Sequence, residues 1–419
     1  MERQAIVYMD YPTGAAMVGR LWSRVRNGRE TATFEYDRNW LQRADRFALE
    51  PALMLAPGPY HTGGDRPLFG AIGDSAPDRW GRVLMRRTER RRAEREKQTP
   101  KTLFEIDFLL MVDDEVRSGA LRFSEIEGGP FVAEPGKFRI PPVVDLPRLL
   151  SATEHVIEDK EDDEDLRLLI APGSSLGGAR PKASVRQKDG KLAIAKFPHK
   201  DDTANVVIWE GVALTLAARS GIAIPKWGVE VIGRKAALIL ERFDRRNGVR
   251  VPFLSAMSML GASDGESHSY LEIVEALRQY GAAPNDDLVQ LWRRIVLNVL
   301  ISNTDDHLRN HGFLYEGAAG WRLSPAYDMN PVPVDVKPRV LSTAIDPDDP
   351  SASIDLAFAN ADYFGLKAKD ARNIAAGIAA VVSEWRKVAE SLGLNRAEIN
   401  RMASAFEHED LKKALTRVA

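Results

Sequence analysis

A two-residue turn, Asp189-Gly190, is the feature that most restricts how this chain can fold. An Asp-Gly pair between two apolar, alternating stretches predicts a tight β-hairpin, here over residues 183–197. In the second strand, Leu192, Ile194 and Lys196 share one face because side chains alternate along a strand. Burying a lone ammonium is costly, so Lys196 is predicted to have an anionic partner or ligand.

A helix predicted over residues 204–220 supplies a candidate partner. Its apolar stripe places Glu210 on or beside the buried face. Glu210 is therefore expected to pair with Lys196, with a nucleotide phosphate as a third member. A purely structural salt bridge is the alternative. A second strand pair is expected over residues 227–241, after this helix.

A glycine-containing loop precedes the hairpin. Glycines such as Gly177 and Gly178 let backbone N–H groups approach phosphate oxygens closely, although a plain turn explains them equally well. Ser174 and Ser175 stand just before them, either as loop serines or as phosphorylation sites. A phosphate here would repel nucleotide or displace the loop.

An aspartate and an asparagine five residues apart, Asp305 and Asn310, give the second informative pattern. They follow a helix predicted over residues 286–301, and a short hairpin then leads to Asp328. The D-x-x-x-x-N spacing matches kinase catalytic loops, where the aspartate accepts the proton of the acceptor hydroxyl and the asparagine binds a metal. Magnesium prefers oxygen ligands, so Asn310 and Asp328 with phosphate oxygens suffice for Mg²⁺.

Two other interpretations of this segment stay open. Asp305 and Asp306 could simply cap a helix. Together with His307, His311 and Asp328 they could instead hold two metals in a phosphohydrolase. That chemistry leaves the upstream lysine, glutamate and glycine loop unexplained. The two histidines could also be hydrogen-bonded loop residues without a ligand role.

Composition limits the remaining chemistry. The 419 residues include 58 Lys+Arg and 60 Asp+Glu, so a net charge of −2 gives no global attraction to nucleic acid. The absence of cysteine excludes disulfides, zinc–thiolate sites and a cysteine nucleophile. The first residues lack a signal-peptide pattern, and the apolar stretch 374–382 is too short for a membrane span. A soluble, cytoplasmic protein with no membrane partner is expected.

The first part of the chain is predicted to contain short strands and one charged helix. Ser75 or Asp78 is expected to cap that helix, which runs into an arginine-rich stretch at residues 86–97. A solvated helix face is the simpler interpretation of this stretch, and a nucleic-acid contact is the alternative. Proline, glycine and acidic clusters place a boundary within residues 125–170. The domains expected are residues 1–145, 146–245 and 246–419.

Four motifs occur in a fixed order along the chain. They are Ser175-Leu176-Gly177-Gly178-Ala179-Arg180-Pro181-Lys182, Leu240-Glu241-Arg242-Phe243-Asp244-Arg245, Asn303-Thr304-Asp305-Asp306-His307-Leu308-Arg309-Asn310 and Tyr327-Asp328. In this combination, and with segments 74–82 and 118–123, the chain resembles the HipA family of toxin serine/threonine kinases.

The resemblance implies an α+β, protein kinase-like two-lobe fold with an extra N-terminal β-rich subdomain and an all-helical C-terminal lobe. It implies an ATP- and Mg²⁺-dependent kinase with Asp305 as catalytic base and with Asn310 and Asp328 on magnesium. Ser175 would be an inhibitory autophosphorylation site. The nucleotide contacts that it implies are Gly177, Gly178, Ala179, Arg180, Pro181, Lys182, Lys196, Glu241, Arg242, Phe243, His307, Asn310, Tyr327 and Asp328.

The resemblance also implies partners. Family members pair with a HipB-type helix-turn-helix antitoxin that binds operator DNA, and their targets are aminoacyl-tRNA synthetases, especially glutamyl-tRNA synthetase. Phosphorylation of these targets arrests growth or produces persistence. One departure is Arg180-Pro181, where some members carry Gln-Glu, because proline removes a backbone donor from the loop. A catalytically weak, kinase-fold co-repressor acting with the antitoxin on DNA is the alternative function.

Overall fold

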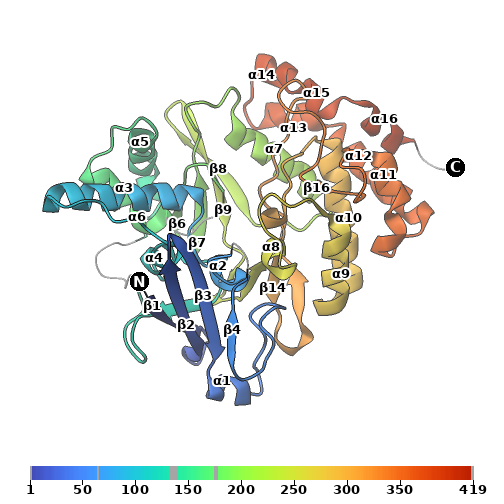
Figure 1. The fold of residues 1–419 in the computed structure, drawn as a ribbon. Helices are drawn as coiled ribbons and strands as arrows, with labels where there is room; N and C mark the ends of the chain where they lie inside the picture. The colour runs from blue at the N-terminus through green and yellow to red at the C-terminus, as the bar shows by residue number, and fades with distance from the viewer. Residues whose placement is uncertain (1, 64–65, 133–139, 174–177, 417–419) are drawn as a thin grey trace. The chain divides into compact units, whose positions relative to one another are not determined.

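The computed structural model describes residues 2–63, 66–132, 140–173 and 178–416, and the chain forms two compact units (Figure 1). The first unit comprises Met1–Asp201 and Glu230–Leu254, and the second comprises Asp202–Val229 and Ser255–Ala419. Ser174, Ser175 and Gly177 lie outside the described residues. Within the described part, we find no helix with the length and apolar character needed to cross a membrane.

An antiparallel sheet opens the first unit, with strand order β4-β3-β2-β1-β5. The short strands predicted for the first part of the chain are present in this sheet. The strands are β1 (Glu2–Met9), β2 (Ala16–Arg26), β3 (Arg29–Tyr36), β4 (Pro59–His61) and β5 (Leu121–Ser124). The helices that accompany them are α1 (Arg38–Gln42), α2 (Gly70–Gly73), α3 (Arg79–Glu96) and α4 (Glu105–Met111).

A four-stranded sheet of order β6-β7-β9-β8 contains the predicted hairpin and the second strand pair. Its strands are β6 (Lys182–Arg186), β7 (Leu192–Lys196), β8 (Trp227–Ile232) and β9 (Lys235–Glu241). In the first unit, α3 packs against α6 (Asp163–Gly173), and α6 packs against both α5 (Leu146–Ile157) and β6. Shorter elements here are η1 (Val143–Asp145), β10 (Arg245–Arg246), β11 (Val249–Arg250) and β12 (Phe253–Ser255).

The prediction of which face of β7 is buried is wrong in part. Leu192 is buried, but Ile194 and Lys196 on the same face are half-buried. Ala193 and Ala195 on the opposite face are fully buried and belong to the apolar core with residues of α5 and α6. Because alanines are small, the helices can approach this side of the sheet closely. A prediction based on large aliphatic residues does not identify alanines as core residues. The face that carries Lys196 is therefore the less covered one.

The second unit is mostly helical rather than all-helical as the resemblance implied, because short strands lie between its helices. Its longest helices are α7 (Val206–Arg219), α9 (Tyr270–Tyr280), α10 (Pro284–Leu300) and α12 (Ala368–Val382). The others are α8 (Ala256–Met259), α11 (Ile354–Ala359), α13 (Trp385–Ser391), α14 (Arg396–Arg401), α15 (Ala403–Phe406) and α16 (Glu409–Leu415), with the short turns η2 (Leu308–Asn310), η3 (Gly317–Ala319) and η4 (Ala361–Phe364).

Aromatic packing joins distant parts of this unit. The rings of Trp385 and Phe406 stack with centroids 4.4 Å apart, and the ring of Trp209 on α7 lies 6.1 Å from Trp385. The predicted hairpin after the polar loop is present as β14 (Gly312–Tyr315) and β15 (Trp321–Leu323), and β13 (His268–Ser269) pairs with β16 (Thr343–Ala344). The helical core thus supports a loop between α10 and β14, which carries the candidate chemistry.

Candidate functional site

The buried aspartate of the polar loop, Asp306, is a structural residue. Its carboxylate accepts hydrogen bonds from the hydroxyl of Tyr270 at 2.5 Å and from Nδ2 of Asn298 at 2.7 Å, and it is 2.8 Å from Nε2 of His311. Burial raises the pKa of Asp306, but the charge of His311 and these hydrogen bonds outweigh it and hold the pKa below its ordinary value. These contacts tie the loop to α9 and α10.

Its neighbour Asp305 has the opposite environment. The side chain of Asp305 is 66% exposed, and Oδ1 lies 3.0 Å from Nζ of Lys337. The Nδ2 group of Asn310 donates to the main-chain carbonyl of Asp305 at 3.2 Å, which fixes the loop between the two residues. The carboxylate of Asp305 is exposed, and a hydrogen bond from Asn310 holds its main chain in place. It is therefore accessible to a hydroxyl group, as a catalytic base must be.

Asp328 follows the hairpin and lies beside this loop. Its φ of 59° is in the left-handed region, which is uncommon for a residue other than glycine and is often found at functional sites. On one side, the hydroxyl of Tyr327 donates to the carbonyl of Arg309 at 2.8 Å. On the other side, the main-chain N–H of Asn330 donates to Oδ1 of Asn303 at 3.3 Å. Both contacts attach the Asp328 segment to the loop.

The donor set of this loop fits magnesium. Because Nδ2 of Asn310 faces the carbonyl of Asp305, its amide oxygen is the atom that can ligate a cation, and Asp328 adds a carboxylate. A hard divalent cation takes such oxygen ligands and keeps waters or phosphate oxygens for the rest. In addition, Nδ1 of His307 is buried without a hydrogen-bond partner in the described part of the chain, which leaves this atom able to contact a ligand.

The alternative of a two-metal phosphohydrolase finds no support in these contacts. His311 and Asp306, two of the proposed ligands, bond to each other in the interior. Among the residues that the structure describes, no group of three or more acidic or histidine side chains is arranged to hold a metal ion. The helix-capping alternative also fails for Asp305, because the short turn η2 has His307 at its N-cap.

In the first unit, two lysines face each other across the hairpin. Lys182 and Lys196 are directly opposite in the register of β6 and β7, so their side chains lie on one face. Lys182 is buried, and its Nζ lies 3.3 Å from Oδ2 of Asp78. The other oxygen of Asp78 accepts a hydrogen bond from the N–H of Gly81 at 2.7 Å, so Asp78, rather than Ser75, caps α3.

Burial controls the charge of Asp78. It raises the pKa of this carboxyl to about 6, although the ammonium of Lys182 acts in the opposite direction. The sequence predicted a helix cap here and did not predict the pairing with Lys182. Because Asp78 precedes the hairpin by about a hundred residues, no local spacing could have found it.

Gly178, in the described part of the glycine loop, lies against the same lysine. A Cβ atom on Gly178 would fall 2.8 Å from Nζ of Lys182, and its φ of +101° is also unfavourable for other residues. Gly178, Ala179 and Arg180 are exposed, whereas Pro181 is buried and its carbonyl accepts a hydrogen bond from the N–H of Phe197 at 3.0 Å. The described part of the loop thus brings exposed backbone to a buried ammonium.

Three of the implied nucleotide contacts, Glu241, Arg242 and Phe243, have different environments. Arg242 is buried, and its guanidinium donates to Asp244 at 2.6 and 2.9 Å and to the carbonyl of Arg117 at 3.0 Å. A nucleotide contact at this position would therefore use the main chain. Glu241 is half-buried and lies 3.2 Å from Nζ of Lys191. The ring of Phe243 lies 6.2 Å from that of Phe253.

The predicted pair of Lys196 and Glu210 stays a prediction. Glu210 is buried on α7, as the helical pattern indicated, and Lys196 is half-buried at the end of β7. They belong to different units of the chain.

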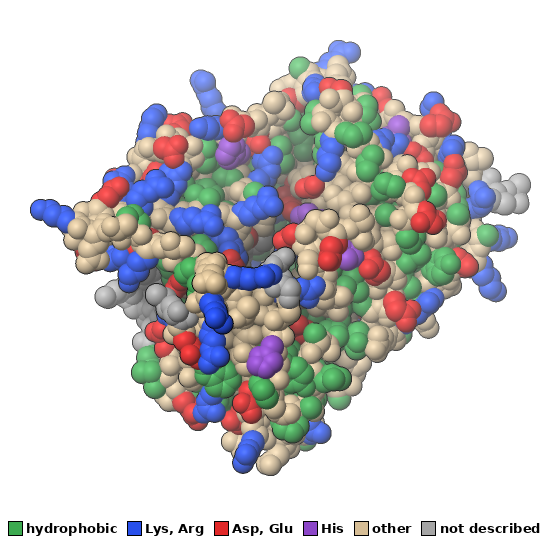
Figure 2. Space-filling view, in the orientation of Figure 1, with side chains coloured by type: hydrophobic (Ala, Val, Ile, Leu, Met, Phe, Trp, Pro, Cys, Tyr) green, Lys and Arg blue, Asp and Glu red, His purple; other side chains and the backbone are tan. Residues whose placement is uncertain are grey.

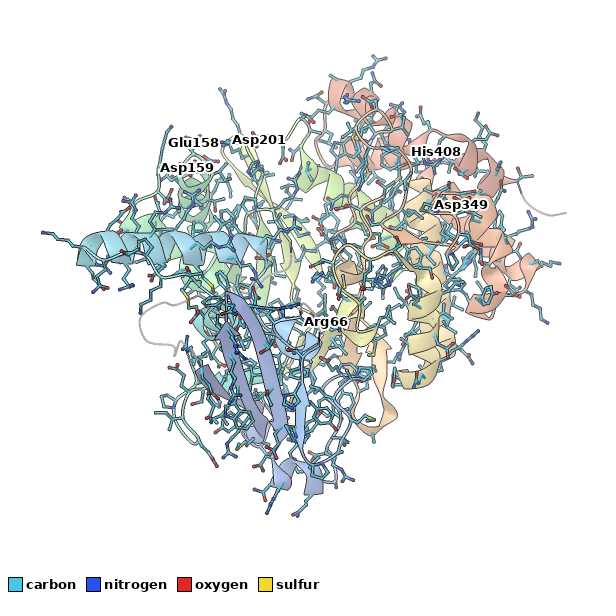
Figure 3. All side chains as sticks on the ribbon, viewed as in Figure 1. Arg66, Glu158, Asp159, Asp201, Asp349 and His408 are labelled. Atoms are coloured by element: carbon cyan, nitrogen blue, oxygen red, sulfur yellow. The ribbon has the colours of Figure 1, made fainter. Side chains whose placement is uncertain are left out.

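The arginine-rich helix α3 has two different faces. One face is neutralised by the acidic connection between α5 and α6. Arg87 pairs with Asp159 at 2.6 Å (Asp159 is labelled in Figure 3), and Arg95 lies 3.6 Å from Asp163. The other face exposes a line of cations, which we call the basic stripe: Arg79, Arg86, Arg90 and Lys97. Figure 2 shows basic side chains gathered over this part of the first unit.

The basic stripe follows from helical spacing. Steps of seven, four and seven residues keep the four side chains on one side of the helix over about 27 Å. Among the described residues, none of the four has an ion pair with an acidic side chain, although Arg86 lies over the ring of Phe108. One face of α3 therefore has structural ion pairs, and the exposed face fits either a solvated surface or a nucleic-acid contact.

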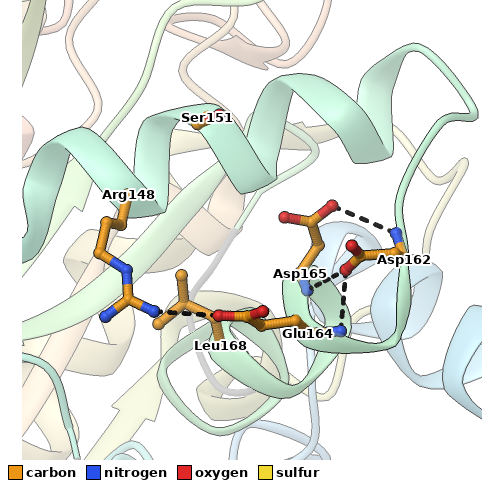
Figure 4. Close-up of a pocket in the computed structure, with 6 residues that line it drawn as sticks. All are labelled: Arg148, Ser151, Asp162, Glu164, Asp165 and Leu168. Atoms are coloured by element: carbon orange, nitrogen blue, oxygen red, sulfur yellow. Dashed lines mark hydrogen bonds and ion pairs between the residues drawn. The ribbon is translucent and has the colours of Figure 1, made fainter.

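A shallow hollow between α5 and α6 has a structural explanation (Figure 4). Its volume is about 160 Å³, and its wall includes Arg148 and three acidic residues. Oδ1 of Asp162 accepts hydrogen bonds from the N–H groups of Glu164 and Asp165, both at 2.8 Å. Such bonds satisfy the first N–H groups of α6, so Asp162 stabilises the start of this helix.

Comparison with known proteins agrees with the motifs. A family model described as the HipA-like C-terminal domain matches residues 174–385. A putative kinase from Haemophilus influenzae is 23% identical in an alignment of 195 residues, and the match covers 41% of this chain. The chain spans only 56% of the length of that relative.

One solved structure is similar in fold over nearly the whole chain, and a second matches a part of it. The HipA chain from the Shewanella oneidensis MR-1 HipA, HipB and operator DNA complex matches with a TM-score of 0.67, over 98% of this chain and 96% of the other, at 18% identity. The Helicobacter pylori proinflammatory kinase CtkA matches with a TM-score of 0.45, over 56% of this chain and 92% of the other, at 14% identity. The first likeness covers both units, including the N-terminal sheet.

Proposed function

The chain belongs to the HipA family of toxin kinases, and on that premise we propose an ATP- and Mg²⁺-dependent serine/threonine protein kinase. We propose further that it is the toxin of a HipBA-like toxin–antitoxin module in the cytoplasm. The observation that carries the kinase proposal is the loop in which Asp305 is exposed beside Asn310, with Asp328 attached to it. A carboxylate base, an amide oxygen and a second carboxylate are the groups that phosphoryl transfer uses, and this supports the proposal.

Phosphoryl transfer needs positioning and charge stabilisation more than strong bases. Asp305 would accept a hydrogen bond from the acceptor hydroxyl and take its proton as the bond to phosphorus forms. Asn310 and Asp328 would hold magnesium, which when bound neutralises the phosphate oxygens. Lys196, Lys182 and the exposed backbone of Gly178 would contact the phosphates of ATP, with Glu210 orienting Lys196.

A protein acceptor is favoured by the surface that follows Asp328. Residues 332–341 expose three valines, at 42%, 58% and 46%, which are Val334, Val336 and Val340. Neighbouring exposed apolar side chains mark contact sites for other proteins. We propose that this segment contacts the protein substrate, for which an aminoacyl-tRNA synthetase, glutamyl-tRNA synthetase or one like it, is the candidate from the family.

Self-inhibition is part of the proposal. Ser175 lies in the segment just before Gly178, and a phosphate there would add negative charge where the nucleotide phosphates are to bind. We therefore propose that autophosphorylation at Ser175 weakens ATP binding. Equal ATP affinity of the phosphorylated and unphosphorylated chains would contradict it.

A co-repressor role on DNA is the second candidate function, and the basic stripe on α3 favours it. Cations in line along about 27 Å of helix suit the phosphates of a nucleic-acid backbone. The related Shewanella protein is described in a complex with HipB and operator DNA. We propose a HipB-like helix-turn-helix antitoxin as partner, with operator DNA bound through the complex.

The test of the kinase proposal uses purified glutamyl-tRNA synthetase, ATP and Mg²⁺. We expect the wild-type chain, and not Asp305→Ala, to phosphorylate the synthetase, and the antitoxin to reduce the rate. Phosphorylation of other proteins but not of the synthetase would remove only the substrate assignment. Normal assembly with antitoxin and operator, without nucleotide binding at high ATP, would favour the co-repressor function.

A further inference from the structure

Lys337 contacts the candidate base although no sequence motif includes it. Its Nζ lies 3.0 Å from Oδ1 of Asp305, and this ion pair is the side-chain contact of the Asp305 carboxylate in the described part of the chain. Lys337 stands 32 residues further along the sequence. The pairing therefore arises from the fold.

The segment that carries Lys337 is fixed to the catalytic loop at both ends. The N–H of Val332 donates to the carbonyl of Ser302 at 3.3 Å, and the N–H of Ser342 donates to the carbonyl of Thr304 at 3.0 Å. Between these points, Asp335 pairs with Arg401 at 2.8 Å. The segment thus forms an arch whose ends lie just before Asp305, and the arch brings Lys337 back to it.

The ion pair is too exposed to serve stability. The side chains of Lys337 and Asp305 are 39% and 66% exposed, and ion pairs in such positions contribute little to folding. The segment that carries Lys337 is anchored at both ends and holds the lysine next to the carboxylate of Asp305. We therefore expect Lys337 to have a chemical role.

The loop has a cationic side chain of its own, but it pairs with a residue other than Asp305. Arg309, between the two key residues of the loop, pairs with Asp264 at 2.6 Å. Buried Arg294 donates to the carbonyl of Ser324. The ammonium of Lys337 is therefore the positive group held next to the carboxylate of Asp305.

We propose that Lys337 is a further catalytic residue, whose ammonium binds an oxygen of the phosphoryl group during its transfer. This inference rests on the proposed kinase function. In the reaction, the acceptor oxygen bonds to the γ-phosphorus while the bond from that phosphorus to the bridging oxygen breaks. The electron pair of that bond leaves with ADP, and the hydroxyl proton passes to Asp305. Lys337 stays protonated throughout and moves from the carboxylate to the phosphoryl oxygens, where negative charge must be stabilised.

The test compares Lys337→Ala and Lys337→Arg with the wild type. Lys369→Ala, at an exposed lysine on α12, is the matched control. For each protein, kcat and the KM for ATP are measured, together with the affinities for Mg·ADP and for Mg·ADP with aluminium fluoride, which imitates the transferring phosphoryl group. Because the pair is exposed, all variants are expected to fold with unchanged melting temperature.

We expect Lys337→Ala to lower kcat by about 10- to 100-fold, the range for a charge-stabilising donor, with the KM for ATP within about twofold of wild type. Affinity for the aluminium fluoride complex should fall by a similar factor, while affinity for Mg·ADP alone is unchanged. Lys337→Arg should recover part of both losses because it keeps the cation. The control should match the wild type throughout.

Three results would overturn the inference. Wild-type kcat and wild-type aluminium fluoride affinity in Lys337→Ala would remove Lys337 from catalysis and leave the kinase function intact. A rise in kcat would make Lys337 an inhibitory contact. A wild-type chain that binds no nucleotide and transfers no phosphate would remove the kinase function, and this inference with it.

Discussion

Asp305 and Asp306 are adjacent in sequence and opposite in environment. The first carboxylate is exposed and paired with Lys337, whereas the second is buried among Tyr270, Asn298 and His311. Asp306 is therefore a structural residue, whereas Asp305 is the carboxylate for which we propose a chemical role.

Stability should distinguish the two aspartates. Asp306→Ala removes a buried acceptor from three polar partners, so we expect the free energy of unfolding to fall by about 3 kcal/mol or more. Asp305→Ala, the matched control, should change it by less than about 1 kcal/mol because the carboxylate is exposed. Denaturant unfolding of both variants measures this difference. Equal losses would contradict the assignment of Asp306 as a structural residue.

Asp78 should make stability depend on pH. Since burial raises its pKa to about 6, the folded chain holds a proton on Asp78 that the unfolded chain has already released. Its contribution is complete below the ordinary pKa and is lost as pH rises from about 4 to about 6. Asp78→Asn keeps a capping side chain and cannot titrate.

The measurement is the difference in unfolding free energy, wild type minus Asp78→Asn, across this pH range. We expect the difference to decrease as pH rises and to become constant above about pH 7. An increase with pH would show that the pairing with Lys182 outweighs burial.

The exposed valines should affect the phosphorylation of the protein substrate and not the affinity for ATP. Val336→Asp places a charge on the exposed apolar segment after Asp328. We expect phosphorylation of the protein substrate to fall by about tenfold, since a lost apolar contact costs ~1–2 kcal/mol. ATP affinity should not change. Val231→Asp, at a valine exposed to 77% in the first unit, is the control and should retain full activity.

The basic stripe should contribute to DNA binding by the complex. Arg86→Glu with Arg90→Glu reverses two exposed charges on α3. Operator affinity of the complex with antitoxin should fall, and its salt dependence should become less steep because fewer phosphates are neutralised. Arg396→Glu, at an exposed arginine on α14, should have no effect. Unchanged affinity in the double variant would leave the stripe as a solvated surface.

The sequence was most informative where local patterns dominate. The Asp-Gly turn predicted the β6–β7 hairpin, and helical periodicity predicted α7 and α10, including the burial of Glu210. Periodicity did not predict the buried face of β7, because two alanines carry it. The D-x-x-x-x-N spacing identified Asp305 and Asn310 but could not show which neighbouring aspartate is buried.

Contacts between residues far apart in the sequence could not be predicted from the sequence. Asp78 meets Lys182, and Lys337 meets Asp305, across separations of 104 and 32 residues. Neither pair has a spacing rule, since only the path of the chain sets these distances. Such contacts need a structure or related sequences.

The most direct test of the account is phosphoryl transfer by the chain itself. Intact mass and phosphopeptide mapping after incubation with ATP and Mg²⁺ would be compared for the wild type and Asp305→Ala. We predict added phosphate, at Ser175 or Ser174, in the wild type only. Equal phosphate in both proteins, or none in a folded wild type that was free of phosphate at the start, would contradict it.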